Sequence, residues 1–306
     1  MAQTTEKTFS KFDEKQAKTY ARTRPDYHPS VYEAVIYRHR ETGGQFGNLV
    51  DVGCGPGLAT KTLASHFEHA TGLDPSEGMV SAARSQGILT STSSEVRFEV
   101  STAEDLGQTL SPPIGAGSVD LISAANAAHW FDMPRFWNAA ARLLKPGGSV
   151  ALWTSGEIRV HPSMPNAEAI QAALDKIDDD ELMAFYEPGN LLTRNGYRDL
   201  PLPWTADPPV SEFDESTFFR KQWDTDEKFT TQQADVTLDM FEKVMENASP
   251  VRRWREAHPD DVGTERDVVK MQRHAIERLL HEAGVKEGEE KLRGSVKGVL
   301  LVVKRT

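Results

Sequence analysis

The sequence predicts an α/β domain built on a mostly parallel sheet with helices on both faces, together with a mostly helical cap. Three observations favour this fold. Short apolar runs alternate with amphipathic stretches over residues 31–153, the first of these runs leads directly into a glycine-rich turn, and one more apolar run returns at 299–303. Strands and helices that alternate at this spacing are typical of a parallel sheet covered on both sides.

The elements follow one another in a regular order. Predicted strands lie at 48–53, 70–74, 96–100, 119–124 and 150–153, and predicted helices at 58–67, 76–84 and 133–144. Ser76 is a plausible N-cap of the second helix, because its hydroxyl can accept a hydrogen bond from the first turn. The third helix should end at Lys145-Pro146-Gly147-Gly148, because proline and glycine stop helices.

After residue 154 this rhythm breaks. Prolines punctuate residues 160–210, and longer helices are expected at 234–258 and 264–283. We therefore divide the chain into four parts. These are an N-terminal tail and lid helix (1–30), a cofactor-binding core (31–155), a mostly helical cap with a returning strand (156–285) and a C-terminal strand that completes the sheet (286–306).

Composition restricts the function. The 306 residues carry 35 basic and 46 acidic side chains, a net charge of −11, which disfavours a nucleic-acid partner. The one cysteine excludes an intrachain disulfide and a Cys-rich zinc site, and no metal-binding spacing occurs. No run approaches the roughly 18 apolar residues of a membrane helix, and residues 1–18 lack a secretory apolar core. We therefore expect a cytoplasmic protein that acts on a small molecule.

The glycine-rich turn is the first segment that carries chemistry. In Leu49-Val50-Asp51-Val52-Gly53-Cys54-Gly55-Pro56-Gly57 a strand runs into three glycines, so the backbone can approach a ligand closely. The spacing is not the G-x-G-x-x-G of a dinucleotide site, which argues against an NAD-dependent oxidoreductase. Asp51 suits a ligand with an ammonium group, such as S-adenosylmethionine. The alternative is a packing turn in which Asp51 caps the helix.

Two further segments complete a nucleoside site. Asp74 ends the second strand, where a carboxylate can accept both ribose hydroxyls. Met79 could pack on adenine or belong to the core. In the segment Ser101–Asp105 the Ala103 N–H and the side chain of Thr102 or Glu104 are candidates for adenine recognition.

A fourth segment places polar and aromatic groups at the same edge. The strand 119–124 leads to Asn126, His129 and Trp130 before the next helix. Ligands of parallel α/β sheets bind beyond the carboxyl ends of the strands, so these side chains should face the reaction.

These segments together resemble the class I S-adenosylmethionine-dependent methyltransferases. The sequence motif AHWFD followed by LLKPGG, together with the Tyr20–Pro29 segment, resembles the trans-aconitate methyltransferase-like branch of small-molecule enzymes. The resemblance covers residues 48–153 and 17–29 and implies a Rossmann-like fold of seven strands. The cofactor contacts that we expect are Asp51, Gly53, Cys54, Gly55, Asp74, Pro75, Met79, Thr102, Ala103, Glu104 and Asn126.

The first functional hypothesis is methyl transfer to a carboxylate oxygen of a trans-aconitate-like acid by in-line displacement. A carboxylate is ionised at neutral pH and needs no base. Arg24 could hold such a substrate bidentately, with Tyr20, Tyr27 and His129 as further donors and Trp130 and Trp153 as walls. The alternative for Arg24 is a surface or helix-capping role.

Two other hypotheses stay open. In one, the acceptor is a hydroxyl or thiol of a natural product, and His129 takes its proton. In the other, the fold binds the cofactor as a regulatory partner without turnover. The oligomeric state is open between monomer and homodimer. The acidic run 178–181 is expected to be a solvated face, and the cap tryptophans Trp204, Trp223 and Trp254 are expected to form its core.

Overall fold

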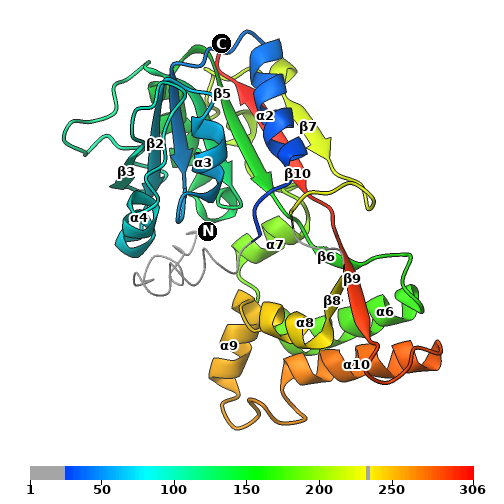
Figure 1. Ribbon diagram of the computed structural model, residues 1–306. Coiled ribbons are helices and arrows are strands. Elements are labelled where there is room, and N and C mark those ends of the chain that lie inside the picture. Colours follow the sequence, from blue (N-terminus) through cyan, green and yellow to red (C-terminus); the bar gives the residue numbers. More distant parts are fainter. Residues whose placement is uncertain (1–24, 232–234) are drawn as a thin grey trace.

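The computed structural model describes residues 25–231 and 235–306, which form a large sheet lobe and a smaller cap (Figure 1). The large sheet has the strand order β3-β2-β1-β4-β5-β10-β7. Its strands are β1 (Asn48–Val52), β2 (His69–Asp74), β3 (Arg97–Val100), β4 (Val119–Ala125), β5 (Leu144–Thr154), β7 (Phe219–Gln222) and β10 (Val299–Lys304). Strands β1 to β5 pair in parallel, whereas β10 is antiparallel to both of its neighbours.

Helices cover both faces of this sheet, because successive side chains of a strand point to opposite faces. In β1, Leu49 packs in one apolar cluster and Val50 in the other. The cluster of Leu49 contains side chains of α2 (Pro29–Glu41), α3 (Leu58–Ala64) and α4 (Glu77–Arg84). The cluster of Val50 contains side chains of α5 (Met133–Leu143). The expected arrangement of a sheet between helical layers is confirmed.

The expected elements of residues 48–143 are all present, with ends shifted by a few residues. The Ser76 hydroxyl accepts a hydrogen bond from the Met79 N–H, as an N-cap should. The start of the next strand is wrong. The strand predicted at 150–153 begins six residues earlier, because β5 includes residues 144–149, and its pairing with β4 shifts register between Val119 and Leu121.

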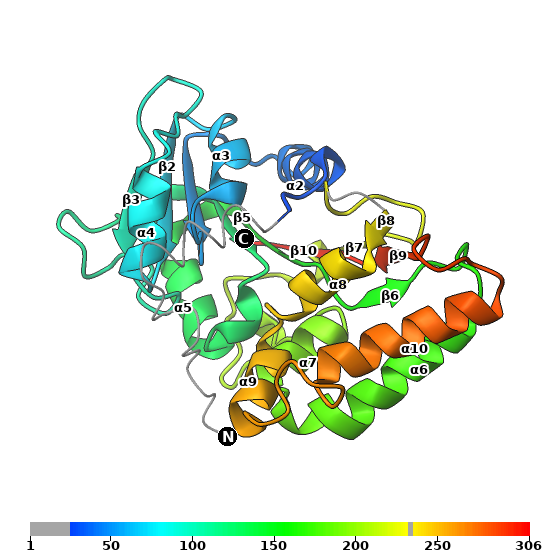
Figure 2. The same cartoon turned by 60° about the horizontal axis from the view of Figure 1, so that its bottom comes forward.

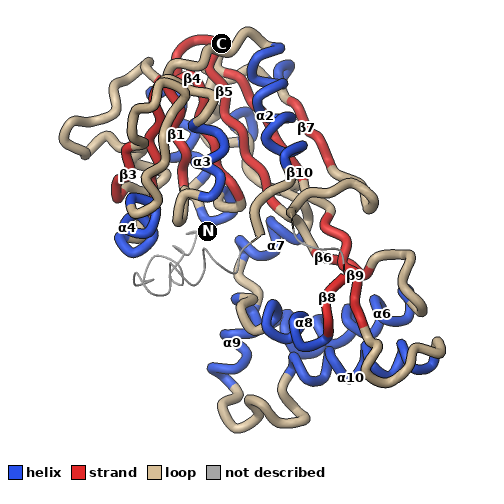
Figure 3. Tube along the Cα trace, in the orientation of Figure 1, coloured by secondary structure: helices blue, strands red, loops and turns tan. Residues whose placement is uncertain are grey.

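The cap combines helices with a small antiparallel sheet (Figure 3). Its helices are α6 (Ala167–Ile177), α7 (Pro188–Arg194), α8 (Leu238–Met245), α9 (Ser249–Ala257) and α10 (Val268–Glu282). Its strands β6 (Ile158–Val160), β9 (Lys291–Val296) and β8 (Asp235–Thr237) pair in that order. The helix expected at 234–258 is two helices, because Pro250 begins a new one in the first turn of α9. Figure 2 shows α6 and α10 side by side on the outside of the cap.

The chain crosses between the two lobes several times. Strand β7, inside the predicted cap region, lies in the large sheet and pairs with β10. The C-terminal part differs from the prediction, because β9 belongs to the cap sheet and only β10 completes the large one. Two of the crossings touch: a Cβ on Gly156 would lie 2.5 Å from the Lys297 carbonyl oxygen. Of the three tryptophans expected in the core of the cap, only Trp254 is buried there. Trp223 is buried in the cluster of Leu49, and the partly buried Trp204 packs against the cluster of Val50, so both belong to the large sheet lobe.

Candidate active site

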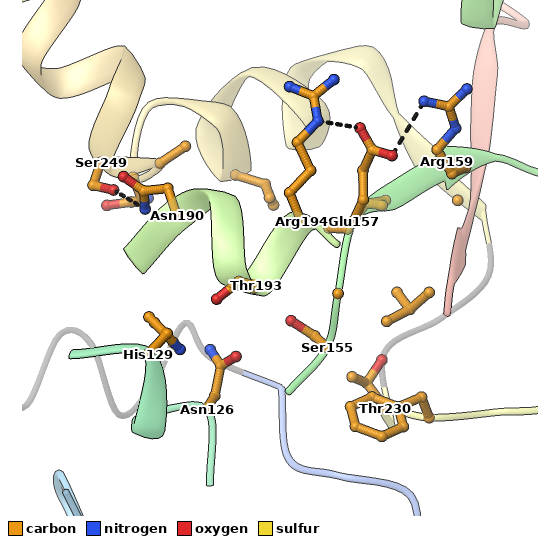
Figure 4. Close-up of a pocket in the computed structure, with 18 of the residues that line it drawn as sticks. Asn126, His129, Ser155, Glu157, Arg159, Asn190, Thr193, Arg194, Thr230 and Ser249 are labelled. Atoms are coloured by element: carbon orange, nitrogen blue, oxygen red, sulfur yellow. Dashed lines mark hydrogen bonds and ion pairs between the residues drawn. The ribbon is translucent and has the colours of Figure 1, made fainter. Parts of the chain in front are cut away.

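A cavity of about 1290 Å³ lies between the carboxyl ends of the parallel strands and the cap. Most of the residues expected from the sequence line it, and Figure 4 shows that Asn126 and His129 face the cap helix that carries Asn190, Thr193 and Arg194. The expected residues that line the cavity are Gly53, Gly55, Asp74, Pro75, Met79, Thr102, Ala103, Glu104, Asn126, His129 and Trp130. Four separate turns, each following a different strand, therefore meet at one place.

The glycine turn leaves room for a ligand. Gly53 has φ +64° and Gly55 has φ +53°, which glycine adopts without strain. A Cβ on Gly53 would lie 2.6 Å from that of Ala127, whereas one on Gly55 would meet no atom within 4 Å. The Asp74 carboxylate accepts hydrogen bonds of 2.9 Å from the N–H groups of Gly55 and Ser76. These bonds hold an acid at the tip of β2, the position from which it can reach ribose hydroxyls.

The side chains of Asp51 and Cys54 do not line the cavity, which corrects their expected contacts with a cofactor. Asp51 is fully buried beneath the turn, where it accepts hydrogen bonds from Thr60 Oγ1 at 2.6 Å and Ser123 Oγ at 2.7 Å. Burial raises its pKa to about 6. It therefore ties β1 to α3 and β4. The Cys54 thiol packs in the apolar core, and burial raises its pKa.

The expected adenine edge also serves the fold. Glu104 lines the cavity, and its Oε1 accepts a hydrogen bond of 2.9 Å from the Asp132 N–H at the start of α5. Met79 lines the cavity with only 3% of its surface exposed, so it contributes to the core as well. The adenine contacts of both residues stay predictions.

His129 belongs to a chain of hydrogen bonds that the sequence did not reveal. It lies in the 3-10 helix η1 (Ala128–Trp130), and its Nδ1 is 2.8 Å from the hydroxyl of Tyr197. That hydroxyl is buried and also hydrogen-bonds the Thr154 side chain, while burial raises its pKa. Thr154 Oγ1 donates to Asn126 Oδ1 at 2.7 Å. The chain links two lining residues through two buried hydroxyls.

The residues expected to bind substrate are less well placed. Trp153 is fully buried in β5 and does not line the cavity, so its predicted role as a wall is wrong. Tyr27 packs edge-on against Trp153 at 5.7 Å between ring centroids and also stays outside the lining. The next residue, His28, lines the cavity instead. Tyr20 and Arg24 lie outside the described residues.

An ionic belt of five side chains lines the cavity, and Figure 4 shows Glu157, Arg159 and Arg194 of this belt above His129. It consists of Glu157, Arg159, Asp175, Asp178 and Arg194. Glu157 lies between the two arginines, 3.2 Å from Arg159 Nη1 and 3.0 Å from Arg194 Nε. Arg159 also binds Asp175 at 2.8 Å, and Arg194 binds Asp178. Both cations are therefore already paired, and the belt carries one excess negative charge.

The belt corrects one expectation. Asp178 belongs to the acidic run that we expect to be solvated, yet its side chain is only 15% exposed and accepts a hydrogen bond from the Tyr186 hydroxyl. Within the described ranges, acidic, His and Cys side chains form no group of three or more that could hold a metal ion. The helices of the same ranges include none with the length and apolar composition needed to cross a membrane.

Comparisons with known proteins agree with this geometry. Residues 50–152 match the family model of the methyltransferase domain. A Dictyostelium discoideum protein described as a "putative methyltransferase" is 33% identical over 156 residues, covering 50% of this chain and 53% of that protein. A "probable S-adenosylmethionine-dependent methyltransferase" of Saccharomyces cerevisiae is 31% identical over 134 residues, covering 44% and 43%. The matched segments thus span about half of these relatives.

One solved structure is similar over nearly its whole length. It is a "putative type II methyltransferase" from Anaeromyxobacter dehalogenans, 25% identical with a TM-score of 0.59, covering 92% of this chain and 97% of that one. The sheet order, the match of residues 50–152 and this similarity lead to one conclusion. The chain has the Rossmann-like fold of the class I methyltransferases, whose cofactor is S-adenosylmethionine.

Proposed function

We propose that this protein transfers a methyl group from S-adenosylmethionine to a small molecule held under the cap. The observation that carries the proposal is that the glycine turn, Asp74, His129 and the cap all line the same cavity. Bound there, the cofactor supplies a methyl group on a positively charged sulfur. Asp74 would hold its ribose, and the open face of Gly55 would admit its methionine part. The cap and sheet would exclude water and align the acceptor.

The charges of the lining favour an uncharged acceptor. Of the described residues that line the cavity, seven are Asp or Glu and four are Lys or Arg. The two belt arginines are already paired with carboxylates. A di- or tricarboxylate would meet net repulsion and paired cations. The trans-aconitate-like substrate therefore stays a prediction that depends on Arg24, whereas the lining supports a hydroxyl acceptor.

A hydroxyl acceptor must lose a proton, and the hydrogen-bond chain supports His129 as the group that takes it. Thr154 donates to Asn126 Oδ1, and the Tyr197 hydroxyl lies within hydrogen-bond reach of both the Thr154 side chain and His129 Nδ1. We assign the arrangement in which Tyr197 donates to Thr154 and accepts from His129 Nδ1, so that the ring proton lies on Nδ1. In this tautomer Nε2 carries the lone pair. We assign to Nε2 the proton that leaves the acceptor oxygen as the new oxygen–carbon bond forms.

The test is a methylation assay that compares trans-aconitate and citrate with simple phenols, read as S-adenosylhomocysteine and methylated product. We expect the phenols to be methylated. His129→Ala should lower kcat by about 10²- to 10⁴-fold. Tyr197→Phe should lower kcat by roughly tenfold and alter its pH profile, with the KM for the cofactor unchanged. The variant loses the hydrogen bond that fixes the tautomer of His129 but keeps the imidazole that acts as the base.

Tyr37→Phe is the matched control for the second variant, because Tyr37 is exposed and lies outside the cavity lining. It should behave as the wild type. Preferential methylation of the carboxylic acids with full activity in His129→Ala would overturn the hydroxyl acceptor. Calorimetry without heat on addition of S-adenosylhomocysteine to folded protein would overturn the methyltransferase proposal itself.

A further inference from the structure

The cavity is larger than one ligand requires. Pockets that enclose a drug-sized molecule have volumes of about 300 to 1000 Å³. This cavity has a volume of about 1290 Å³, and the residues proposed to bind the cofactor line its sheet side. The rest of the space extends into the cap. The chemistry of that part of the wall indicates what else binds there.

Beside the ionic belt, the cap contributes a group of apolar side chains to the wall. We use the term cap chamber for the part lined by Leu174, Leu182, Phe241, Val244, Met245 and Val251. Several of these side chains keep apolar surface uncovered: Val244 is 39% exposed, and Leu174, Phe241 and Met245 are partly buried. An apolar ligand that covers apolar surface in an open cavity removes this surface from water, which favours binding.

Helix α8 is built to present this surface. Phe241, Val244 and Met245 follow the i, i+3, i+4 spacing that places side chains on one face of a helix. The face away from the cavity is polar, and ion pairs tie it to α10: Glu242 binds Lys270 at 2.9 Å and Arg273 at 3.0 Å. The apolar face is therefore held toward the cavity by contacts on the other side of the helix.

We infer that the methyl acceptor carries an elongated apolar tail and that the cap chamber binds this tail while the hydroxyl lies near His129. The inference rests on the proposed function, because the same cavity joins the chamber to the cofactor side. Continuity of the lining from His129 to α8 supports it. The molecule that fits is amphipathic: uncharged, with a hydroxyl at one end and a hydrocarbon body of several carbons.

The test measures binding separately from turnover. Phenol, 4-propylphenol and 4-heptylphenol are titrated calorimetrically into protein saturated with S-adenosylhomocysteine. We expect the affinity to rise by about fourfold for each added methylene until the chamber is filled. Val244→Asp should reduce the affinity for 4-heptylphenol at least tenfold and that for phenol less than twofold.

Met240→Asp is the matched control, because Met240 lies on the same helix, is 47% exposed and does not line the cavity. It should bind the whole series as the wild type does. An affinity independent of chain length, or an equal loss in both variants, would overturn the chamber.

Methylation of the same three phenols separates the two proposals. If phenol is methylated but binding does not depend on chain length, the cap chamber is overturned as the tail site and the proposed methyltransferase activity stands. Chain-dependent binding without methylation of any member overturns the inference that the tail belongs to the methyl acceptor. Methylation that improves with chain length supports both.

Discussion

Individual residues around the site carry strain or an unfavourable charge. Asn126 and Tyr197 have φ values of +53° and +59°, the left-handed region that residues other than glycine seldom adopt. Each such residue costs on the order of 1 to 3 kcal/mol, and such residues gather at functional sites. Here both belong to the hydrogen-bond chain of His129. The strain therefore falls on residues that fix the proposed base.

Asp51 gives a pH dependence of stability. Its pKa rises from 3.8 to about 6 in the folded protein, chiefly because burial disfavours the charged form. The folded state thus binds this proton more tightly than the unfolded state. The resulting stabilisation is complete below pH 3.8 and is lost as the pH rises through about 6.

Asp51→Asn removes this titration. We expect the free energy of unfolding of the wild type, minus that of Asp51→Asn, to fall by about 3 kcal/mol between pH 3.5 and pH 7. Urea unfolding at a series of pH values measures the difference. The difference should be constant above pH 7. A difference that does not change between pH 3.5 and pH 7 would show that Asp51 has an ordinary pKa.

At the scale of elements, the contact between α7 and η1 joins the cap to the proposed base. Gly189 of α7 is buried against η1, where a Cβ would lie 2.7 Å from the Trp130 ring and 2.8 Å from the His129 carbonyl oxygen. Asn190 then ties α7 to Ser249 of α9 through a hydrogen bond of 3.1 Å. The position of η1 therefore depends on the cap.

Gly189→Ala should separate these two elements. The added methyl group overpacks the contact by about 1 to 3 kcal/mol, so α7 must shift and η1 with it. We expect kcat to fall about tenfold or more, whereas the Kd of S-adenosylhomocysteine stays unchanged, because Gly55 and Asp74 lie on other turns. Leu191→Ala, at a 44% exposed position of the same helix, serves as the control. Equal kcat values for both variants would argue against the contact.

At the scale of the whole molecule, the cofactor should stabilise the fold. A ligand at 100 times its Kd adds about 2.7 kcal/mol to the free energy of unfolding. For a chain of this size we expect Tm to rise by about 5 °C with S-adenosylhomocysteine at that concentration. Differential scanning calorimetry measures the shift.

Asp74→Ala should abolish most of this shift at the same ligand concentration, because it removes the acid at the tip of β2. Asp260→Ala removes an exposed carboxylate in the cap and should keep the full shift. A full shift in both variants would show that Asp74 does not hold the cofactor.

The sequence by itself determined the parts of the site that depend on local order. A strand followed at once by a turn places its next residues at the carboxyl edge of a parallel sheet. Gly53, Gly55, Asp74, Ala103 and His129 could therefore be assigned to one edge without knowledge of their contacts, and all of them line the cavity.

Only the tertiary structure decided what surrounds those residues. Tyr197 lies 68 positions from His129, and Glu157 lies 37 positions from Arg194, so no spacing in the sequence reveals either pair. Asp51 and Trp153 were misjudged for the related reason that a residue near a strand end can point beneath the turn or away from the cavity. Which acids neutralise which arginines, and where apolar surface stays uncovered, depends on how distant segments pack.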